Sequence, residues 1–226
     1  MPTVLVTGSN RGIGLEFVRQ YAASGWKVIA CCRKPDTAKT LKTVPGEVRI
    51  EAVELTDPVS MRDLAKGLKG EAIDLLINNA GVLGPNQSFS DTDYAAFDTV
   101  MRSNVLGPMA MVESLLPNLE AGGVKTAVAI SSGWGSVGTI QSGGRYLYGP
   151  SKAALNMVVK AQSIDLHDKG ILAVAISPGW VATDMGGKGA DLTPAESVGN
   201  MRSLIAGLTA ADSGKFYSHK GHEIPW

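Results

Sequence analysis

Two side chains in the second half of the sequence, Tyr148 and Lys152, have the chemistry and spacing of a proton-transfer pair. Residues four apart lie on one face of a helix, so the phenol and the ammonium can share one site. A free tyrosine has a pKa of about 10 and is a poor base near neutral pH, but a nearby ammonium stabilises its phenolate. The same spacing is common in helices where both residues are structural. The interpretation therefore depends on which other polar residues lie near them.

Other polar residues of the expected site follow three buried apolar runs. The run at 124–132 ends in Ser131 and Ser132, the run at 73–78 leads into NNAG (78–81), and PGWVATD (178–184) follows the run at 171–177. Ligands of open α/β sheets bind at the carboxyl ends of the strands. A serine hydroxyl at that edge can stabilise charge on an oxygen without titrating. We therefore expect one site along one edge of a sheet.

A glycine-rich turn, TGSNRGIG (7–14), lies between an apolar run and an amphipathic one. Its spacing is Gly8-x-x-x-Gly12-x-Gly14, one residue longer overall than the G-x-G-x-x-G of the common dinucleotide fingerprint. Small residues let the backbone approach an anion, and the following helix N-terminus supplies unpaired N–H donors. The alternative is a plain tight turn, but Asn10 and Arg11 favour a phosphate-binding turn.

Arg33 and Lys34 follow the second apolar run, about 20 residues beyond the turn. In a dinucleotide-binding fold this position contacts the adenosine ribose, and an acidic residue there holds the hydroxyls of NAD. A cation instead favours the 2′-phosphate of NADP. The alternative for Arg33 is a solvated surface charge.

Short apolar runs alternate with helical patterns along the whole chain. The expected strands are 3–7, 26–32, 48–55, 73–78, 124–132, 171–177 and a weaker 214–218, and the expected helices are 12–24, 58–69, 91–119, 146–168 and 194–210. The strands are nearly continuously apolar, as in sheets covered on both faces. The alternation predicts an α/β fold, a single doubly wound Rossmann-fold domain over 1–226 with a mostly parallel sheet of about seven strands. The last helix opens with Thr193 as N-cap, Pro194 at the first helical position and Glu196 completing a capping box.

Bulk properties exclude several partners. The formal net charge is zero, which gives no electrostatic case for nucleic acid, and no apolar run approaches the ~20 residues that span a membrane. The histidines His167, His219 and His222 lack metal-ligand spacing, so we expect no metal site. Adjacent Cys31 and Cys32 would point to opposite faces of a strand, which disfavours a disulfide. A reducing, cytoplasmic location fits.

The chain resembles the short-chain dehydrogenase/reductase family in six motifs that occur in the family's order. They are TGSNRGIG (7–14), NNAG (78–81), Asn104, ISS (130–132), YGPSK (148–152) and PGWVATD (178–184). Within the family, the compact length, CCRKP (31–35), PGWVATDMGG (178–187) and the ending GHEIPW (221–226) are most similar to C-factor and sniffer-type carbonyl reductases.

This resemblance implies a role for four residues. Tyr148 would be the general acid that protonates a carbonyl oxygen during reduction, and the base in the reverse direction. Lys152 would hold the nicotinamide ribose and lower the pKa of the tyrosine. Ser132 would hydrogen-bond the substrate oxygen, and Asn104 would support a water chain.

The resemblance also implies NADP as the cofactor, with NADPH preferred over NADH, bound by residues from several segments. These are Gly8, Asn10, Arg11, Gly12, Ile13 and Gly14 at the pyrophosphate and adenosine end, Arg33 at the 2′-phosphate, Asn78, Ala80 and Gly81 at the adenosine and ribose, Tyr148 and Lys152 at the nicotinamide ribose, and Pro178, Gly179, Val181 and Thr183 at the nicotinamide. Many relatives carry Asp-Val beside the adenine, where this chain has Glu54 and Leu55. The longer glutamate leaves the adenine contact open, and Asp57 nearby suits a helix cap.

Three neighbouring residues are alternatives for the two reacting side chains. Tyr146 lies two residues before Tyr148 but has no lysine four positions later. Ser131 competes with Ser132 for the substrate oxygen, and Ser136 is a further candidate. The family pattern favours Ser132 and Tyr148, with the others as pocket or loop residues.

Asn104 suggests a hypothesis about the helix that carries it. Pro108 lies four residues later and has no N–H, so in a continuous helix over 91–117 the carbonyl of Asn104 lacks its usual partner. A freed carbonyl at a proline kink is a natural water site. The water would connect Asn104 to Lys152. The alternative is a bend that only fits the curvature of the sheet.

These residues together predict an NADP(H)-dependent oxidoreductase that interconverts a carbonyl and an alcohol. The alternative is a C-factor-like signalling or nucleotide-sensing protein on the same fold. Segment 184–193 is the expected substrate lid, over an apolar pocket lined by Trp134, Ile140, Tyr146, Trp180 and Met185. Family members often pair through helices that correspond to 91–119 and 146–168, so a homodimer or homotetramer is expected.

Overall fold

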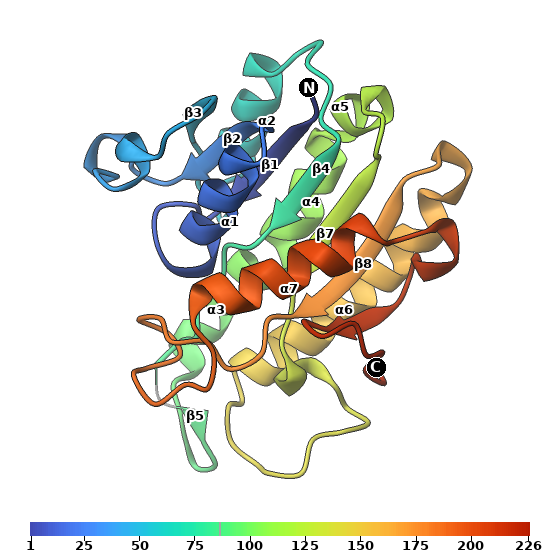
Figure 1. The fold of residues 1–226 in the computed structure, drawn as a ribbon. Coiled ribbons are helices and arrows are strands. Elements are labelled where there is room, and N and C mark those ends of the chain that lie inside the picture. Colours follow the sequence, from blue (N-terminus) through green and yellow to red (C-terminus); the bar gives the residue numbers. More distant parts are fainter. Residues whose placement is uncertain (86) are drawn as a thin grey trace.

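Seven parallel strands form the centre of the protein in the order β3-β2-β1-β4-β7-β8-β9 (Figure 1). The computed structural model describes residues 1–85 and 87–226. The strands are β1 (Thr3–Thr7), β2 (Lys27–Cys32), β3 (Val48–Ala52), β4 (Leu75–Asn78), β7 (Thr126–Ile130), β8 (Leu172–Ser177) and β9 (Phe216–Ser218). Strand order reverses between β1 and β4, which lie side by side, and such a reversal opens a crevice at the carboxyl ends of the strands.

Helices cover both faces of this sheet. One face carries α1 (Gly12–Ala23) and α7 (Pro194–Ala206), and the other carries α2 (Pro58–Gly67), α4 (Gly107–Ser114), α5 (Leu116–Ala121) and α6 (Tyr148–Asp165). Alternation along β1 explains both layers: Val4 and Val6 pack with α1 and α7, whereas Leu5 packs with α2, α4 and α5. The predicted doubly wound Rossmann fold is therefore confirmed, and its main sheet is entirely parallel.

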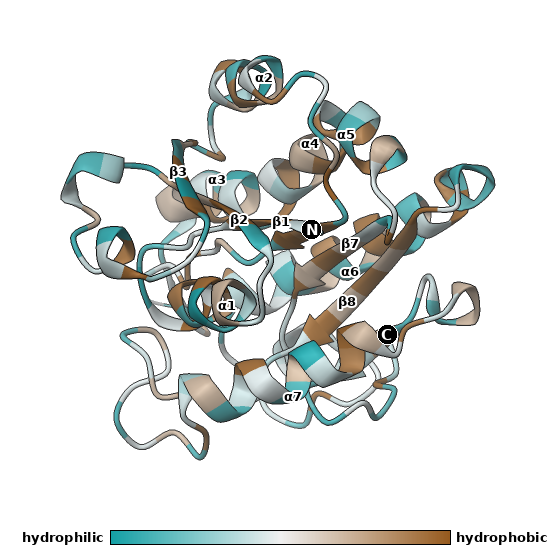
Figure 2. Cartoon of the chain, turned by 45° about the horizontal axis from the view of Figure 1, so that its top comes forward, coloured by the Kyte–Doolittle hydropathy of each residue, from teal (hydrophilic) through white to brown (hydrophobic). Residues whose placement is uncertain are grey.

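Apolar side chains concentrate in the strands, and the hydrophilic residues lie mainly on the outer helix surfaces and in the loops (Figure 2). Two predicted helix caps are present. The hydroxyl of Thr193 accepts from the amide of Glu196, whose carboxylate in turn accepts from Thr193, and Asp57 accepts from the amide of Val59 at the start of α2. Among the described residues, no helix is long and apolar enough to cross a membrane.

The prediction of one helix over 91–119 is wrong. This region begins with an antiparallel hairpin of β5 (Gln87–Ser88) and β6 (Asp91–Thr92), followed by α3 (Phe97–Met101), a π-helical turn at Arg102–Leu106, α4 and α5. Prolines at the starts of α4 and α5 remove amide donors and divide the helix. The expected helix 146–168 is also shorter, because α6 begins at Tyr148.

The π-helical turn accommodates the proline that the sequence singled out. The amide of Gly107 donates to the carbonyl of Arg102, five residues earlier, and Pro108 has no amide to offer to the carbonyl of Asn104. The backbone therefore widens at the predicted break. A water at the Asn104 carbonyl remains a prediction.

Candidate active site

A cavity of about 1000 Å³ opens at the carboxyl ends of the strands, where the strand order reverses. It is lined by fifteen of the residues that the sequence proposed. They are Gly8, Asn10, Arg11, Gly12, Ile13, Gly14, Arg33, Glu54, Leu55, Ala80, Gly81, Tyr148, Lys152, Pro178 and Thr183. Six separate stretches of sequence, which come after β1, β2, β3, β4, β7 and β8, thus meet at one cavity.

The three glycines of the first turn are required by its geometry. Gly8 and Gly12 have φ of 65° and 54°, in the left-handed region that favours glycine. A Cβ on Gly14 would lie 2.2 Å from the carbonyl oxygen of Gly8, so any side chain there would displace the turn. The turn delivers the N-terminus of α1 to the cavity, and the first turn of that helix holds no acidic residue. Such an end attracts anions.

Asn79, which the sequence interpretation passed over, holds the turn against β4. Its side-chain amide donates to the carbonyls of Thr7 (2.9 Å) and Gly8 (3.3 Å), and its residue lines the cavity. Asn78 lies elsewhere: its side chain is buried and donates to the carbonyl of Pro108 at 3.2 Å. Because successive residues of a strand point to opposite faces, the two asparagines of NNAG divide these tasks.

Cations surround the end of the cavity near β2. Arg33 and Lys34 line it, and neither takes part in an ion pair among the described residues. Arg11 donates to Asp184 at 2.8 Å, which ties the glycine-rich turn to segment 184–193. Three cations beside a helix N-terminus fit a ligand that carries several phosphate groups.

Glu54, at the expected adenine position, is engaged within its own turn. Its Oε1 accepts from the amide of Thr56 at 3.1 Å and from the hydroxyl of Thr56 at 2.9 Å, while the residue still lines the cavity. The carboxylate is therefore held in a fixed orientation at the cavity wall.

Lys152 and Tyr148 meet at the other end of the cavity, on the first turn of α6. The Lys152 side chain is 4% exposed, and its Nζ donates to the carbonyl of Ile130 at 2.8 Å and lies 5.7 Å from the centre of the Tyr148 ring. Burial lowers the pKa of Lys152 to about 8, because the charged form is poorly solvated. A Cβ on the neighbouring Gly81 would lie 3.5 Å from Nζ, an ordinary contact distance, and 3.1 Å from Oδ1 of Asn104, a tight one.

Three influences set the pKa of Tyr148. Burial raises it, while a hydrogen bond with Ser132 and the positive charge of Arg145 both lower it. The family resemblance implied that Lys152 lowers the pKa of Tyr148. In the structure, Ser132 and Arg145 lower that pKa instead. Arg145 was not foreseen, since it lies outside the family motifs.

The competing serines and tyrosine are engaged elsewhere or exposed. Ser131 lines the cavity, but its hydroxyl is buried and donates to Asn156 at 2.6 Å. Ser136 donates to the carbonyl of Pro225 at 2.6 Å. Ser132 accepts from the amide of Trp134 at 3.3 Å and hydrogen-bonds Tyr148. Tyr146 is 40% exposed and lies against Phe89, with their ring centres 6.1 Å apart.

Asn104 lies behind the cavity rather than in its wall. It is fully buried; its Oδ1 accepts from the amide of Val82 (2.8 Å), and its Nδ2 donates to the carbonyl of Val82 (2.8 Å) and to Ser151 (2.9 Å). Asn104 therefore joins the loop after β4 to the helix that carries Tyr148 and Lys152.

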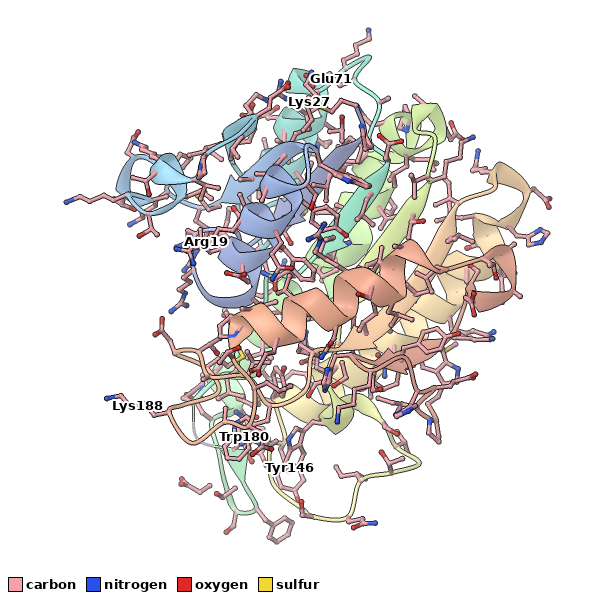
Figure 3. The ribbon with its side chains drawn as sticks, in the orientation of Figure 1. Arg19, Lys27, Glu71, Tyr146, Trp180 and Lys188 are labelled. Atoms are coloured by element: carbon pink, nitrogen blue, oxygen red, sulfur yellow. The ribbon has the colours of Figure 1, made fainter. Side chains whose placement is uncertain are left out.

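The segment after β8 forms the remaining wall and anchors the expected lid. The amide of Ala182 donates to Leu192, and the amide of Leu192 donates to Trp180, so both ends of 184–193 are fixed. Gly179 packs closely against Leu192 and His219, and the side chain of Val181 is buried. Figure 3 shows Trp180 and Lys188 near Tyr146 at one end of the molecule, far from Lys27 and Glu71.

Gln87 in β5 was also missed by the sequence interpretation. Its Oε1 accepts from the amides of Tyr148 (2.8 Å) and Leu147 (3.2 Å), and its Nε2 donates to the carbonyls of Leu83 (2.7 Å) and Gly84 (3.4 Å). One side chain thus caps the start of α6 and fixes it to the loop after β4. Local sequence carries no signal for it, because the contact spans about sixty residues.

Residues 2–191 match the family model described as short chain dehydrogenase, so the chain belongs to this family of oxidoreductases. The resemblance seen in the motifs is thereby confirmed. No group of three or more His, Cys, Asp or Glu residues in the described part of the chain is arranged to hold a metal ion.

Three known proteins show how far the similarity extends. C-signal of Myxococcus xanthus is 41% identical over 166 residues, which cover 74% of this chain and all of that protein. The carbonyl reductase Sniffer of D. melanogaster has a TM-score of 0.94 at 27% identity over the whole of both chains. The NADPH-bound carbonyl reductase from chicken fatty liver has a TM-score of 0.91 at 35% identity, covering 100% of this chain and 99% of that one.

Replacing Lys152 with methionine is expected to stabilise the fold and to abolish any turnover that depends on the ammonium. A pKa of about 8 instead of the ordinary 10.5 means that protonation at neutral pH costs the folded state about 3 kcal/mol. Loss of the bond to Ile130 offsets about 1 kcal/mol of that gain. Urea denaturation at pH 7 should therefore show a net stabilisation of about 2 kcal/mol.

The pH dependence gives the sign of the effect. The free-energy cost of burying the charged Lys152 is fully present below pH 8 and disappears between pH 8 and 10.5. The extra stability of Lys152→Met over the unmodified chain should therefore shrink over that interval. Lys160→Met, which removes an exposed lysine from the same helix, is the control and should show no such trend. A Lys152→Met protein without added stability at pH 7 would contradict the assigned burial cost.

Replacing Gln87 with methionine is expected to lower kcat about tenfold while leaving the KM for the dinucleotide unchanged. The change removes four hydrogen bonds at the start of α6, where Tyr148 is positioned, and a small displacement of a reacting group is costly. Gln87→Glu keeps the acceptor for the two amides and should retain most of the rate. Gln141→Met, an exposed glutamine, is the control. Equal losses in the Met and Glu variants would argue against positioning through the helix start.

Proposed function

We propose that this chain is an NADP(H)-dependent carbonyl reductase, which also runs in reverse as an alcohol dehydrogenase. The observation that carries the proposal is the meeting of Tyr148 and Lys152 at one end of a cavity whose other end is lined by Arg33 and Lys34. Ser132 is hydrogen-bonded to Tyr148. One end thus suits proton transfer to an oxygen, and the other suits a phosphorylated adenosine.

In this mechanism, Tyr148 and Ser132 receive the carbonyl oxygen of the substrate. The bound dinucleotide supplies the hydride. Tyr148 donates its phenolic proton to the substrate oxygen, and Ser132 hydrogen-bonds both that oxygen and the tyrosine. Lys152, held by the Ile130 carbonyl, orients the ribose and contributes positive charge near the phenol. In the reverse direction, the phenolate of Tyr148 takes the proton of the alcohol.

Two positions favour NADP over NAD. Arg33 and Lys34 line the cavity directly after β2, where an acidic residue would bind the ribose hydroxyls of NAD. The similarity to a carbonyl reductase solved with NADPH supports this preference. The remaining cofactor contacts follow the assignment made from the sequence, with Asn79 added as the residue that shapes the turn.

The substrate end favours an apolar aldehyde or ketone. Met185 lines the cavity, and Ile140, Tyr146 and Trp180 are further exposed large apolar side chains in the segments that follow β7 and β8. Segment 184–193 acts as the substrate lid, and the chain works as a single Rossmann domain. The free cysteines Cys31 and Cys32 support a reducing location such as the cytoplasm.

The decisive experiment measures oxidation of NADPH and NADH by the purified chain with a panel of aromatic and aliphatic carbonyl compounds. NADPH should be preferred, and Arg33→Asp should weaken or reverse that preference because a carboxylate repels the 2′-phosphate. Tyr148→Phe should lower kcat by at least 10² without changing the affinity for NADPH. A clear preference for NADH, or full activity in Tyr148→Phe, would overturn the proposal.

A signalling role is the second candidate, favoured by the 41% identity to C-signal. The Tyr148→Phe variant distinguishes the signalling role from the catalytic one. Restoration of a deletion phenotype by this variant would support signalling, and failure to restore it would support catalysis.

We also propose that the chain forms a homodimer or homotetramer through α6. Met157 and Ile164, seven residues apart on one helix face, are 69% and 66% exposed, with the polar Lys160 and Gln162 between them. Two large apolar side chains are thus open to solvent on this face. Light scattering should show an oligomer for the unmodified chain and a monomer for Met157→Glu/Ile164→Glu. Val59→Glu on α2, also at an exposed position, should leave the mass unchanged. A monomeric unmodified chain would contradict this assembly.

A further inference from the structure

Arg145 lies just before α6 in an unusual backbone conformation. Its φ is 55°, in the left-handed region that side chains with a Cβ rarely adopt, and it follows Gly144 with φ of 89°. Its side chain is exposed, and its guanidinium lies over the ring of Trp134 at 5.0 Å from the ring centre. The stacking restrains a cation that would otherwise move freely.

Trp134 connects this cation to the reacting groups. The amide of Trp134 donates to the hydroxyl of Ser132 at 3.3 Å, and Ser132 hydrogen-bonds Tyr148. The positive charge of Arg145 also acts on the phenol of Tyr148. Arg145 is thus located on the rim of the site, near the place where the substrate oxygen would bind.

The charge of Arg145 is not neutralised by any ion pair among the described residues. The other cations of the cavity have different tasks: Arg11 pairs with Asp184, and Arg33 and Lys34 lie beyond β2. Next to Arg145, the ring of Tyr146 packs against Phe89. The mouth of the site therefore combines aromatic surface with one oriented guanidinium, whose N–H groups make no ion pair among the described residues.

We propose that Arg145 is an anion-recognition subsite, which selects carbonyl substrates that carry a carboxylate on an aromatic or apolar skeleton. A guanidinium binds a carboxylate through two parallel hydrogen bonds, and stacking on Trp134 presents it in one orientation. The aromatic residues hold the skeleton, and the carbonyl reaches Tyr148 and Ser132. This inference rests on the carbonyl reductase function proposed above.

The test compares 3- and 4-carboxybenzaldehyde with their neutral methyl esters, using NADPH. At least one acid should show a kcat/KM about tenfold above that of its ester, mostly through KM, because a charge-assisted hydrogen bond is formed. Arg145→Met should reduce the acid-to-ester ratio of kcat/KM to about one. Loss of the Arg145 charge also acts on Tyr148, but that effect is common to acid and ester and cancels in the ratio. Methionine keeps a Cβ and a similar length, so the backbone strain at this position is matched.

Lys188→Met is the control, since Lys188 is a second cation in segment 184–193 and lies at the same end of the molecule (Figure 3). The subsite is overturned if the unmodified chain reduces acids and esters equally, if Arg145→Met keeps the preference, or if Lys188→Met removes it. If no aldehyde is reduced, the proposed function fails, and calorimetry with 3- and 4-(hydroxymethyl)benzoate decides the subsite. Binding that depends on Arg145 would support it, and binding that is unchanged in Arg145→Met would overturn it.

Discussion

The burial of one ammonium group organises this protein. The side chain of Lys152 is buried at the end of β7. Among the described residues, the carbonyl of Ile130 is the only acceptor for its ammonium group. Burial alone lowers the pKa of Lys152 to about 8. Two glycines enclose this charged lysine: Gly81 lies beside the ammonium, and Gly135 packs against the Lys152 backbone so closely that a Cβ would not fit. Asn104 then fixes the same helix turn to the loop after β4. The enclosure of Lys152 thus combines close packing with a cost for burying a charge.

The two ends of the cavity are built by different physical means. At the β2 end, backbone geometry dominates, since left-handed glycines and the N-terminus of α1 create an anion site that cations complete. At the α6 end, side-chain hydrogen bonds from Gln87, Asn104 and Lys152 converge on one helix turn. Substitutions at the β2 end should therefore act mainly by steric clash with the backbone. Substitutions at the α6 end should act by displacing the start of α6, which carries Tyr148 and Lys152.

The sequence predicted what local patterns encode and missed what only the tertiary structure brings together. Periodicity located all seven strands of the main sheet, and motif order placed fifteen residues at the cavity. It failed over 91–119, where the apolar pattern continues through prolines that break the helix. The NNAG motif does not distinguish its two asparagines, which the structure separates by the face on which each side chain lies. Gln87 and Arg145 carry no motif at all, since their contacts depend on a hairpin and on a left-handed residue.

The ion pair between Arg11 and Asp184 has a consequence for ligand entry. Arg11 is a cation that the phosphates of a dinucleotide would use, so the carboxylate of Asp184 is an internal competitor for the same guanidinium. Both side chains are largely exposed, at 67% and 77%, and exposed pairs contribute about 1 kcal/mol or less. The competition therefore lowers apparent affinity by a few-fold at most. A ligand that took the Arg11 guanidinium would free Asp184, and with it one contact between the glycine-rich turn and segment 184–193.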